Sequence, residues 1–313
     1  MKVKFDENLH RAILFSYKPL TERYKYKNIF QILPPNKGWK QPKYLLGEHP
    51  FVIEYDNSYI RPFLKETERE KDINPEFLKN VDAKGRREWA FLKELYAALT
   101  VFTAHYFFEN NKYSQNRRQL GKRYFYHNFQ NTNKPEIERL DLVDSFEKAR
   151  LLGEKIYFPD SIDHLFDKYF SLKDEALDVL RISILLIYKS YEIRSISPSL
   201  SLVSLISSIE NIVNFEGKDI KFPHCPECNK VRSSLSKRFN DFVIKYSYTT
   251  DTKMMKKNAE FIYKLRSKIA HAGQLLYYDY ASADIDYFCD VQLPKIRRLI
   301  SICFMNWMLA CEP

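Results

Sequence analysis

The sequence predicts a mainly α fold, in which an N-terminal mixed α+β domain precedes a helical C-terminal domain. Apolar residues recur every three or four positions between residues 86 and 109 and again between residues 261 and 270, a spacing typical of amphipathic helices. The run FVIEY at residues 51–55 indicates a strand. We expect the N-terminal domain to cover residues 1–155 and the helical domain to cover residues 156–313.

The N-terminal domain is expected to contain this strand, a loop and a long helix. Residues 34–42, PPNKGWKQP, combine Pro and Gly in the manner of a loop. In the helix predicted over residues 86–109, most of the apolar positions at helical spacing should lie in the core. These positions are Trp89, Leu92, Leu95, Tyr96, Leu99, Phe102 and Tyr106.

Composition indicates a cytoplasmic protein that does not enter a membrane. The chain of 313 residues has five cysteines and begins MKVKFDENLH, which lacks the charged and then apolar pattern of a signal peptide. Its longest uncharged apolar runs, at 182–188 and 299–311, are shorter than the ~20 residues that span a bilayer. With only seven glycines and no Gly-rich phosphate loop, nucleotide hydrolysis is disfavoured.

The charge distribution favours a polyanionic partner. The net charge is +10; residues 1–150 carry 28 Lys+Arg against 20 Asp+Glu (+8), and residues 151–313 carry 22 against 20 (+2). One basic segment mixes cations with aromatic rings, as single-stranded nucleic-acid sites do. Its candidate RNA contacts are Arg117, Arg118, Lys122, Arg123 and Tyr124. The alternative is a solvated basic helix with its rings buried; Arg123 and His127, one turn apart, form a secondary Arg/His pair.

A Cys-Pro-x-Cys insertion near residues 222–230 is a candidate structural zinc site. Cys225 and Cys228 would hold one edge of a tetrahedral ion, with His224 as a third candidate ligand. No second C-x-x-C pair completes the site, so the other candidate ligands are Cys289, Cys303, Cys311 or the same pair of another subunit. An unmetallated turn and a redox role remain as alternatives, while Cys303 and Cys311 are more simply interpreted as small apolar residues of the last helix.

The segment YKLRSKIAHAG at residues 263–273 carries the strongest functional signal. Apolar residues at helical spacing, followed by Gly273, predict a helix that ends here. The apolar positions are Phe261, Ile262, Leu265, Ile269 and Ala270. His271 in the last turn would exchange protons near neutral pH, and Arg266 would fork onto phosphate oxygens. The same spacing also fits a solvated Arg and a helix-capping His.

These two side chains suit the cleavage of RNA. In-line attack by a ribose 2′-hydroxyl needs a proton acceptor and charge stabilisation, and needs no metal. Five residues along one helix correspond to about 140° of rotation, so one chain would not easily aim both groups at one phosphate unless the helix ends at His271. The spacing therefore favours a site shared between two chains.

Residues 160–311 resemble the HEPN superfamily, and within it the ApeA-like HEPN domains, whose hallmark is R-x4-6-H. Residues 178–195 and 201–214 look like the first two helices of that domain, the second of which often carries a glutamate where this chain has Glu210. Residues 233–246 and 257–273 resemble the helices that lead into the motif. The resemblance implies a HEPN-like helical bundle.

The resemblance also implies a metal-independent endoribonuclease that acts as a homodimer, with RNA as substrate and no catalytic cofactor. Such proteins serve as toxins or anti-phage defence effectors. Arg266 and His271 match the catalytic pair. Glu210 lies on an otherwise apolar helix, where it would orient Arg266 or carry a proton; a structural carboxylate paired with an Arg is the alternative. Ser267 takes the polar position after the Arg, where many active members have Asn, Asp or His, so it departs from the pattern. Lys268 is a further candidate RNA contact.

A second function class follows from the same resemblance. Some HEPN domains bind nucleotides or partners without cutting. The chain would then be a non-catalytic module that binds nucleic acid or a protein partner, such as an antitoxin or another component of a defence complex.

Overall fold

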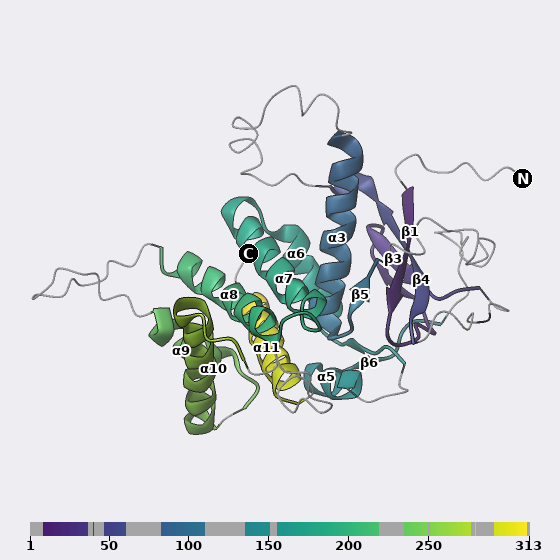
Figure 1. The fold of residues 1–313 in the computed structure, drawn as a ribbon. Helices are drawn as coiled ribbons and strands as arrows, with labels where there is room; N and C mark the ends of the chain where they lie inside the picture. The colour runs from purple at the N-terminus through teal and green to yellow at the C-terminus, as the bar shows by residue number, and fades with distance from the viewer. Residues whose placement is uncertain are drawn as a thin grey trace, which may run out of the picture. The chain divides into compact units, whose positions relative to one another are not determined.

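The computed structural model describes residues 9–36, 40, 47–60, 83–109, 135–150, 155–218, 235–249, 251–276, 279 and 291–311. The chain divides into two compact units, Met1–Phe166 and Asp167–Pro313. The predicted domain boundary, after residue 155, lies 11 residues before the observed boundary between Phe166 and Asp167. The prediction of a mainly α fold with strands near the N-terminus is confirmed (Figure 1).

The N-terminal unit is built on a five-stranded antiparallel sheet of order β2-β3-β4-β1-β5. Its strands are β1 (Leu9–Ser16), β2 (Tyr24–Tyr26), β3 (Phe30–Leu33), β4 (His49–Asp56) and β5 (Phe107–Phe108). The strand predicted from FVIEY is confirmed as the middle of β4, where aromatic and branched side chains suit a buried pleated strand. A short parallel pair, β6 (Arg139–Leu140) and β7 (Phe158–Pro159), lies in the same unit, with α5 (Leu142–Arg150).

The long N-terminal helix is shorter than predicted. Helix α3 covers Ala83–Thr103, and Tyr55 of β4 contacts Phe91 of α3 edge to face, with ring centroids 5.9 Å apart. The chain leaves the helix at Ala104, which has φ 57, and the next residues form strand β5 beside β1. The helical spacing did not reveal this end because Tyr106 continues the apolar period beyond it. Five of the seven expected core positions are buried, whereas Trp89 is 52% exposed and Tyr106 lies outside the helix.

Threonine hydroxyls stabilise this change of direction. Thr103 Oγ1 donates to the Leu99 carbonyl at 2.7 Å, and Thr100 Oγ1 accepts from the Phe107 amide at 3.0 Å. The first contact bonds a hydroxyl back to a carbonyl near the end of α3, and the second gives the first residue of β5 a partner on that helix.

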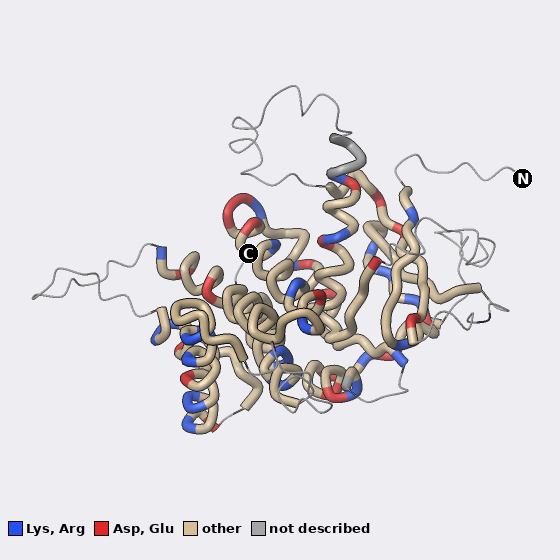
Figure 2. The backbone as a smooth tube through the Cα atoms, viewed as in Figure 1, with Lys and Arg blue, Asp and Glu red and all other residues tan. Residues whose placement is uncertain are grey.

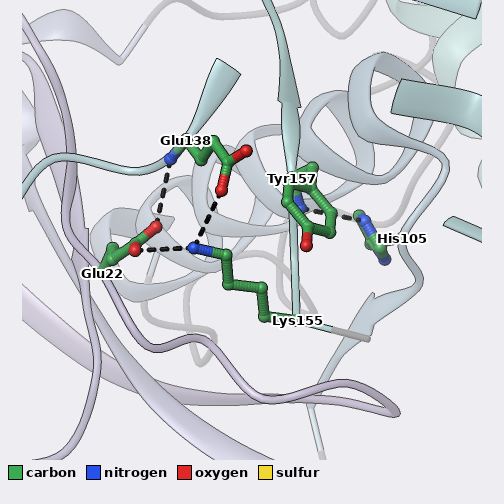
Figure 3. Close-up of polar contacts among 5 residues, drawn as sticks. All are labelled: Glu22, His105, Glu138, Lys155 and Tyr157. Atoms are coloured by element: carbon green, nitrogen blue, oxygen red, sulfur yellow. Dashed lines mark hydrogen bonds and ion pairs between the residues drawn. The ribbon is translucent and has the colours of Figure 1, made fainter. Parts of the chain in front are cut away.

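Polar contacts of Lys155 and of His105 inside this unit are drawn in Figure 3. Lys155 Nζ lies 2.8 Å from Glu22 Oε1 and 3.1 Å from Glu138 Oε2. The buried His105 accepts from the Tyr157 amide at 3.4 Å through Nε2, and burial lowers its pKa to about 3. His105 is therefore held in its neutral form.

The C-terminal unit is helical. Helix α6 (Ile162–Ser171) crosses the division, and the unit continues with α7 (Asp174–Glu192), α8 (Pro198–Glu216), α9 (Leu235–Tyr246), α10 (Thr252–Ala272) and α11 (Leu293–Ala310). Helices were predicted at the positions of α7 to α11, and helices are found there. Helices α7 and α8 pack against each other, and α10 packs against α8 and α9 (Figure 1).

Serines line the contact between α7 and α8. Ser183 Oγ donates to the Ser208 carbonyl at 2.9 Å, and Ser204 Oγ donates to the Leu186 carbonyl at 2.8 Å. Small side chains let the two backbones approach, and their hydroxyls satisfy carbonyls of the neighbouring helix. This packing fixes the position of α8, the helix that carries Glu210.

Helix α11 joins the helices around it through polar side chains. Arg297 is buried and donates to the Ser190 carbonyl at 3.0 Å, while Trp307 Nε1 donates to Glu216 Oε1 at 2.8 Å. Asn306 Nδ2 donates to the Tyr246 carbonyl at 2.9 Å, which links α11 to the end of α9. Among the helices that the structure describes, none is long and apolar enough to cross a membrane.

Candidate active site around Arg266 and His271

Helix α10 carries the R-x4-H segment and ends directly after it. The Asp251 side chain caps the start of the helix by accepting from the Met254 amide at 2.9 Å. At the other end Gly273 adopts φ 62, a left-handed conformation that closes the last turn. The predictions that the helix ends at Gly273 and that His271 lies in its last turn are confirmed.

The apolar spacing that predicted this helix only partly describes its buried face. Ile262 and Ile269 are buried, as expected. Phe261 is 55% exposed and Ala270 is also exposed, so these two residues were wrongly assigned to the apolar face. They lie well away from the centre of the buried arc, at 100° of rotation per residue.

Arg266 holds the centre of the candidate site. Its Nη2 atom donates to Glu210 Oε2 on α8 at 2.7 Å, and its Nη1 atom lies 3.1 Å from His271 Nε2. The Arg266 and Glu210 side chains are 15% and 8% exposed, whereas His271 is exposed. A buried ion pair thus anchors a guanidinium whose other end reaches the surface at the histidine.

The contact with Arg266 orients the His271 ring. A guanidinium can only donate, so His271 Nε2 is the acceptor in this hydrogen bond. To accept a proton from a substrate hydroxyl, Nε2 would first have to release its hydrogen bond with Arg266.

The two side chains meet within one chain. About 140° of rotation separates positions 266 and 271, but α10 ends one residue after His271 and the long Arg266 side chain reaches the ring. The rotation therefore does not require a second chain, which corrects the geometric argument for a shared site. The homodimer itself stays a prediction.

Tyr263 is a member of the site that the sequence did not single out. Arg266 lies over its ring, 5.9 Å from the centroid, and Phe239 of α9 packs against the ring with centroids 5.2 Å apart. Burial, with the charge of Glu210 and a hydrogen bond to that carboxylate, raises the pKa of Tyr263 to about 12. The available signal was its position three residues before Arg266, which places both on one side of the helix.

The remaining predicted residues of α10 differ in their surroundings. Ser267 is half-buried and forms no side-chain hydrogen bond with the residues that the structure describes. Lys268 is exposed. Glu210, predicted as a supporting residue, is 6% exposed and contacts Arg266 directly.

The segment after His271 is tied to the start of α8. The Leu276 amide donates to Ser199 Oγ at 2.7 Å, and Ser199 Oγ donates to Asp279 Oδ2 at 2.5 Å. Asp279 also accepts from the Ser197 hydroxyl. Helix α8 therefore contacts α10 through Glu210, which binds Arg266, and contacts the segment after His271 through Ser199.

Two groups of predicted residues lie outside the described parts of the chain. They are the basic segment with Arg117, Arg118, Lys122, Arg123, Tyr124 and His127, and the zinc candidates His224, Cys225, Cys228 and Cys289. Within the described ranges no three His, Cys, Asp or Glu side chains gather in a group that could hold a metal ion. Cys303 is buried on α11, where burial raises the pKa of its thiol.

The site therefore joins a buried carboxylate of α8 to a guanidinium and an imidazole near the end of α10. Such a group can bind a phosphate through the guanidinium and accept a proton at the imidazole. Comparison of the chain with family models, with curated proteins and with solved structures finds no match in any of the three.

Proposed function

We propose that this protein is a metal-independent endoribonuclease in which Arg266 contacts the scissile phosphate and His271 transfers a proton. One observation carries the proposal: Arg266 Nη1 lies 3.1 Å from His271 Nε2 while Nη2 is held by Glu210 at 2.7 Å. A phosphate at this position would meet a fixed positive charge and an unprotonated nitrogen. The resemblance to HEPN ribonucleases, carried by R-x4-H, supports the same chemistry.

The reaction follows from the two groups. His271 Nε2 takes the proton of the 2′-hydroxyl as the oxygen attacks phosphorus, and the bond from phosphorus to the 5′-oxygen breaks. The products are a 2′,3′-cyclic phosphate and a 5′-hydroxyl, whose oxygen takes up a proton. General acid–base help contributes roughly 10²–10⁴-fold in such sites. The guanidinium of Arg266 would stabilise the charge that develops on the phosphate oxygens.

A homodimer would complete this chemistry. The entering hydroxyl needs a base and the leaving oxygen needs an acid, on opposite sides of an in-line phosphorus. One His271 can supply one of these at a time. A second His271, from another copy of the chain and carrying a proton, would give that proton to the 5′-oxygen as the bond to phosphorus breaks, so the proposal includes the dimer.

The physiological role is proposed on the resemblance alone. Toxins and anti-phage effectors of the HEPN type act on cellular RNA, and an antitoxin or defence partner would hold the activity in check. The net charge of +10 supports binding to RNA.

The test is cleavage of total RNA in EDTA by the wild-type protein, with mapping of new ends. We expect 2′,3′-cyclic phosphate ends from the wild type and none from the Arg266→Ala and His271→Ala variants. His164→Ala is the matched control, since His164 is an exposed histidine on α6 in the other unit. His10 is less suitable as a control because its Nδ1 lies 3.5 Å from Glu88. Cleavage that survives in His271→Ala would contradict the proposal.

The second candidate is a binding module that does not cut. It is favoured by the resting site, in which Glu210 neutralises Arg266 and His271 occupies the other end of the guanidinium. RNA binding by both the wild type and His271→Ala, with no cleavage by either, would support this alternative.

A further inference from the structure

Four lysines of α10 form a stripe that leads to His271. At 100° per residue, positions 253, 257, 264 and 268 fall within about 60° of each other around the helix axis, and position 271 falls in the same arc. Lys253, Lys257, Lys264 and Lys268 are all exposed. We call these four residues the lysine stripe; it runs roughly 27 Å along the axis from position 253 to position 271.

The stripe lies opposite the packed face of the helix. The buried residues Met255, Ile262 and Ile269 fall on the other side of the axis, together with the half-buried Arg266. The side of α10 that carries the stripe is therefore the exposed side of the helix, and the described helices of this unit pack on the other side. His271 lies in the arc of the stripe, and its ring contacts Arg266, whose position falls on the packed side of the helix.

The arrangement of these lysines works against the stability of the helix. Lys253 with Lys257, and Lys264 with Lys268, are like charges four residues apart, which repel each other. The N-cap Asp251 is the acidic residue that opposes the positive end of the helix dipole, and it lies at the start of α10, two residues before Lys253 in the chain. Among the described residues, no acidic side chain forms an ion pair with any of the four. Glu260 lies at the edge of the same arc, three residues after Lys257 and four before Lys264, and offsets part of this repulsion; the five charges sum to +3.

The charge around the stripe is far from balanced. Residues 235–272, which cover α9 and α10, carry nine Lys and Arg against three Asp and Glu, or +6, while residues 151–313 as a whole carry +2. Figure 2 shows Lys and Arg repeated along α10. The positive charge of the C-terminal half is therefore concentrated on the helix with the R-x4-H segment.

We propose that the lysine stripe is a track for single-stranded RNA that leads the strand to His271. Phosphates would lie along the ammonium groups, and Phe261, 55% exposed beside the stripe, offers a ring on which a base can stack. The choice of RNA as ligand rests on the proposed function. Lys268 was already a candidate contact, and the structure adds Lys253, Lys257 and Lys264.

Binding to a strand that cannot be cut tests the track separately from catalysis. The probe is a single-stranded 2′-O-methyl RNA of about twelve nucleotides. At ~3.4 Å per nucleotide, the ~27 Å from position 253 to position 271 would hold ~8 nucleotides, so the probe is longer than the track. The stripe variant changes Lys253, Lys257, Lys264 and Lys268 to Gln. The control variant changes four other exposed lysines of the same unit to Gln, Lys173, Lys237, Lys245 and Lys295, so both lose the same charge.

We expect the stripe variant to bind at least about tenfold more weakly than the control variant. The slope of log K against log salt should fall in magnitude by up to about three, at ~0.7 for each of four phosphate contacts. The control variant should melt slightly earlier, because Lys245→Gln also removes the contact of Lys245 with the Tyr246 ring, whereas the stripe variant should melt as the wild type does. Equal affinity and equal salt slope for the two variants would overturn the track. Binding to the uncleavable probe does not depend on catalysis. If the wild type binds this probe through the stripe but cuts no RNA in the cleavage test, the ribonuclease proposal is overturned and the track is retained.

Discussion

At the scale of single residues, the account depends on how Arg266 is held. The guanidinium donates to a buried carboxylate on one side and to an exposed imidazole on the other. Hydrogen bonds to charged groups contribute about 1.5–3 kcal/mol, so losing the anchor would release Arg266 from this position. Glu210 therefore positions Arg266 without touching the substrate.

The Glu210→Gln variant separates positioning from binding. Gln keeps the size of the side chain and removes its charge, so we expect cleavage to fall roughly 10–100-fold. Binding of an uncleavable RNA should not weaken, since the carboxylate that competes with phosphate for Arg266 is gone. Tyr263→Phe should have little further effect in the Glu210→Gln background, because its hydroxyl acts through Glu210. Strictly additive losses would contradict this link.

His105 predicts a pH dependence of stability. Its folded pKa of about 3 lies below the ordinary 6.5, so the unfolded chain binds the proton more readily. The stabilising effect is complete above pH 6.5 and declines as the pH falls towards 3, by about 1.4 kcal/mol per pH unit or ~2 kcal/mol between pH 7 and 5.

This dependence can be measured by urea unfolding across pH and by NMR of the histidine rings. The difference in unfolding free energy between wild type and His105→Gln should change by ~2 kcal/mol between pH 7 and 5. The His164→Ala control should keep the wild-type slope. A His105 ring that titrates near pH 6.5 in the folded protein would refute the assignment.

At the scale of elements, the end of α10 is the feature that makes the site. Gly273 closes the helix with φ 62, which places His271 in the last turn, beside Arg266. No atom lies near the position of an added Cβ, so the cost of a side chain here is conformational strain alone.

Gly273→Ala should therefore destabilise the protein by about 1–2 kcal/mol and lower cleavage, since a shifted helix end moves His271. Gly273→Asn should recover much of both losses, because Asn tolerates the left-handed conformation. Thermal melting and RNA cleavage of the two variants provide the comparison. Equal activity in Gly273→Ala and wild type would show that the position of the helix end does not matter.

The elements also show where sequence patterns are informative. Apolar spacing and the terminal Gly273 predicted α10 and its end, because both signals are local. The same reasoning extended α3 through Tyr106, since apolar spacing continues where threonine hydroxyls and pairing with β1 turn the chain into β5. Edge pairing with a strand some 90 residues earlier has no local signature.

At the scale of the whole molecule, the mainly α class and the N-terminal strands could be predicted, and the contacts between helices could not. Glu210 was singled out by its place on an apolar helix, but its distance to Arg266 depends on how α8 and α10 pack. Tyr263 was missed because its contacts with Glu210 on α8 and Phe239 on α9 depend on how these helices pack against α10. The lysine stripe was not predicted because the net charge of residues 151–313 is only +2, and the four lysines come together only on one side of α10.

The most direct test of the central claim is whether the ribose 2′-hydroxyl is the nucleophile at a site made by Arg266 and His271. A cleavage site mapped in total RNA is copied into two oligonucleotides, one all-RNA and one with a single 2′-deoxy sugar on the 5′ side of the cut. We predict that the wild type, in EDTA, cuts the first to a 2′,3′-cyclic phosphate and leaves the second intact, and that His271→Ala cuts neither. Cleavage of the deoxy-substituted strand, or cleavage by His271→Ala, would contradict the account.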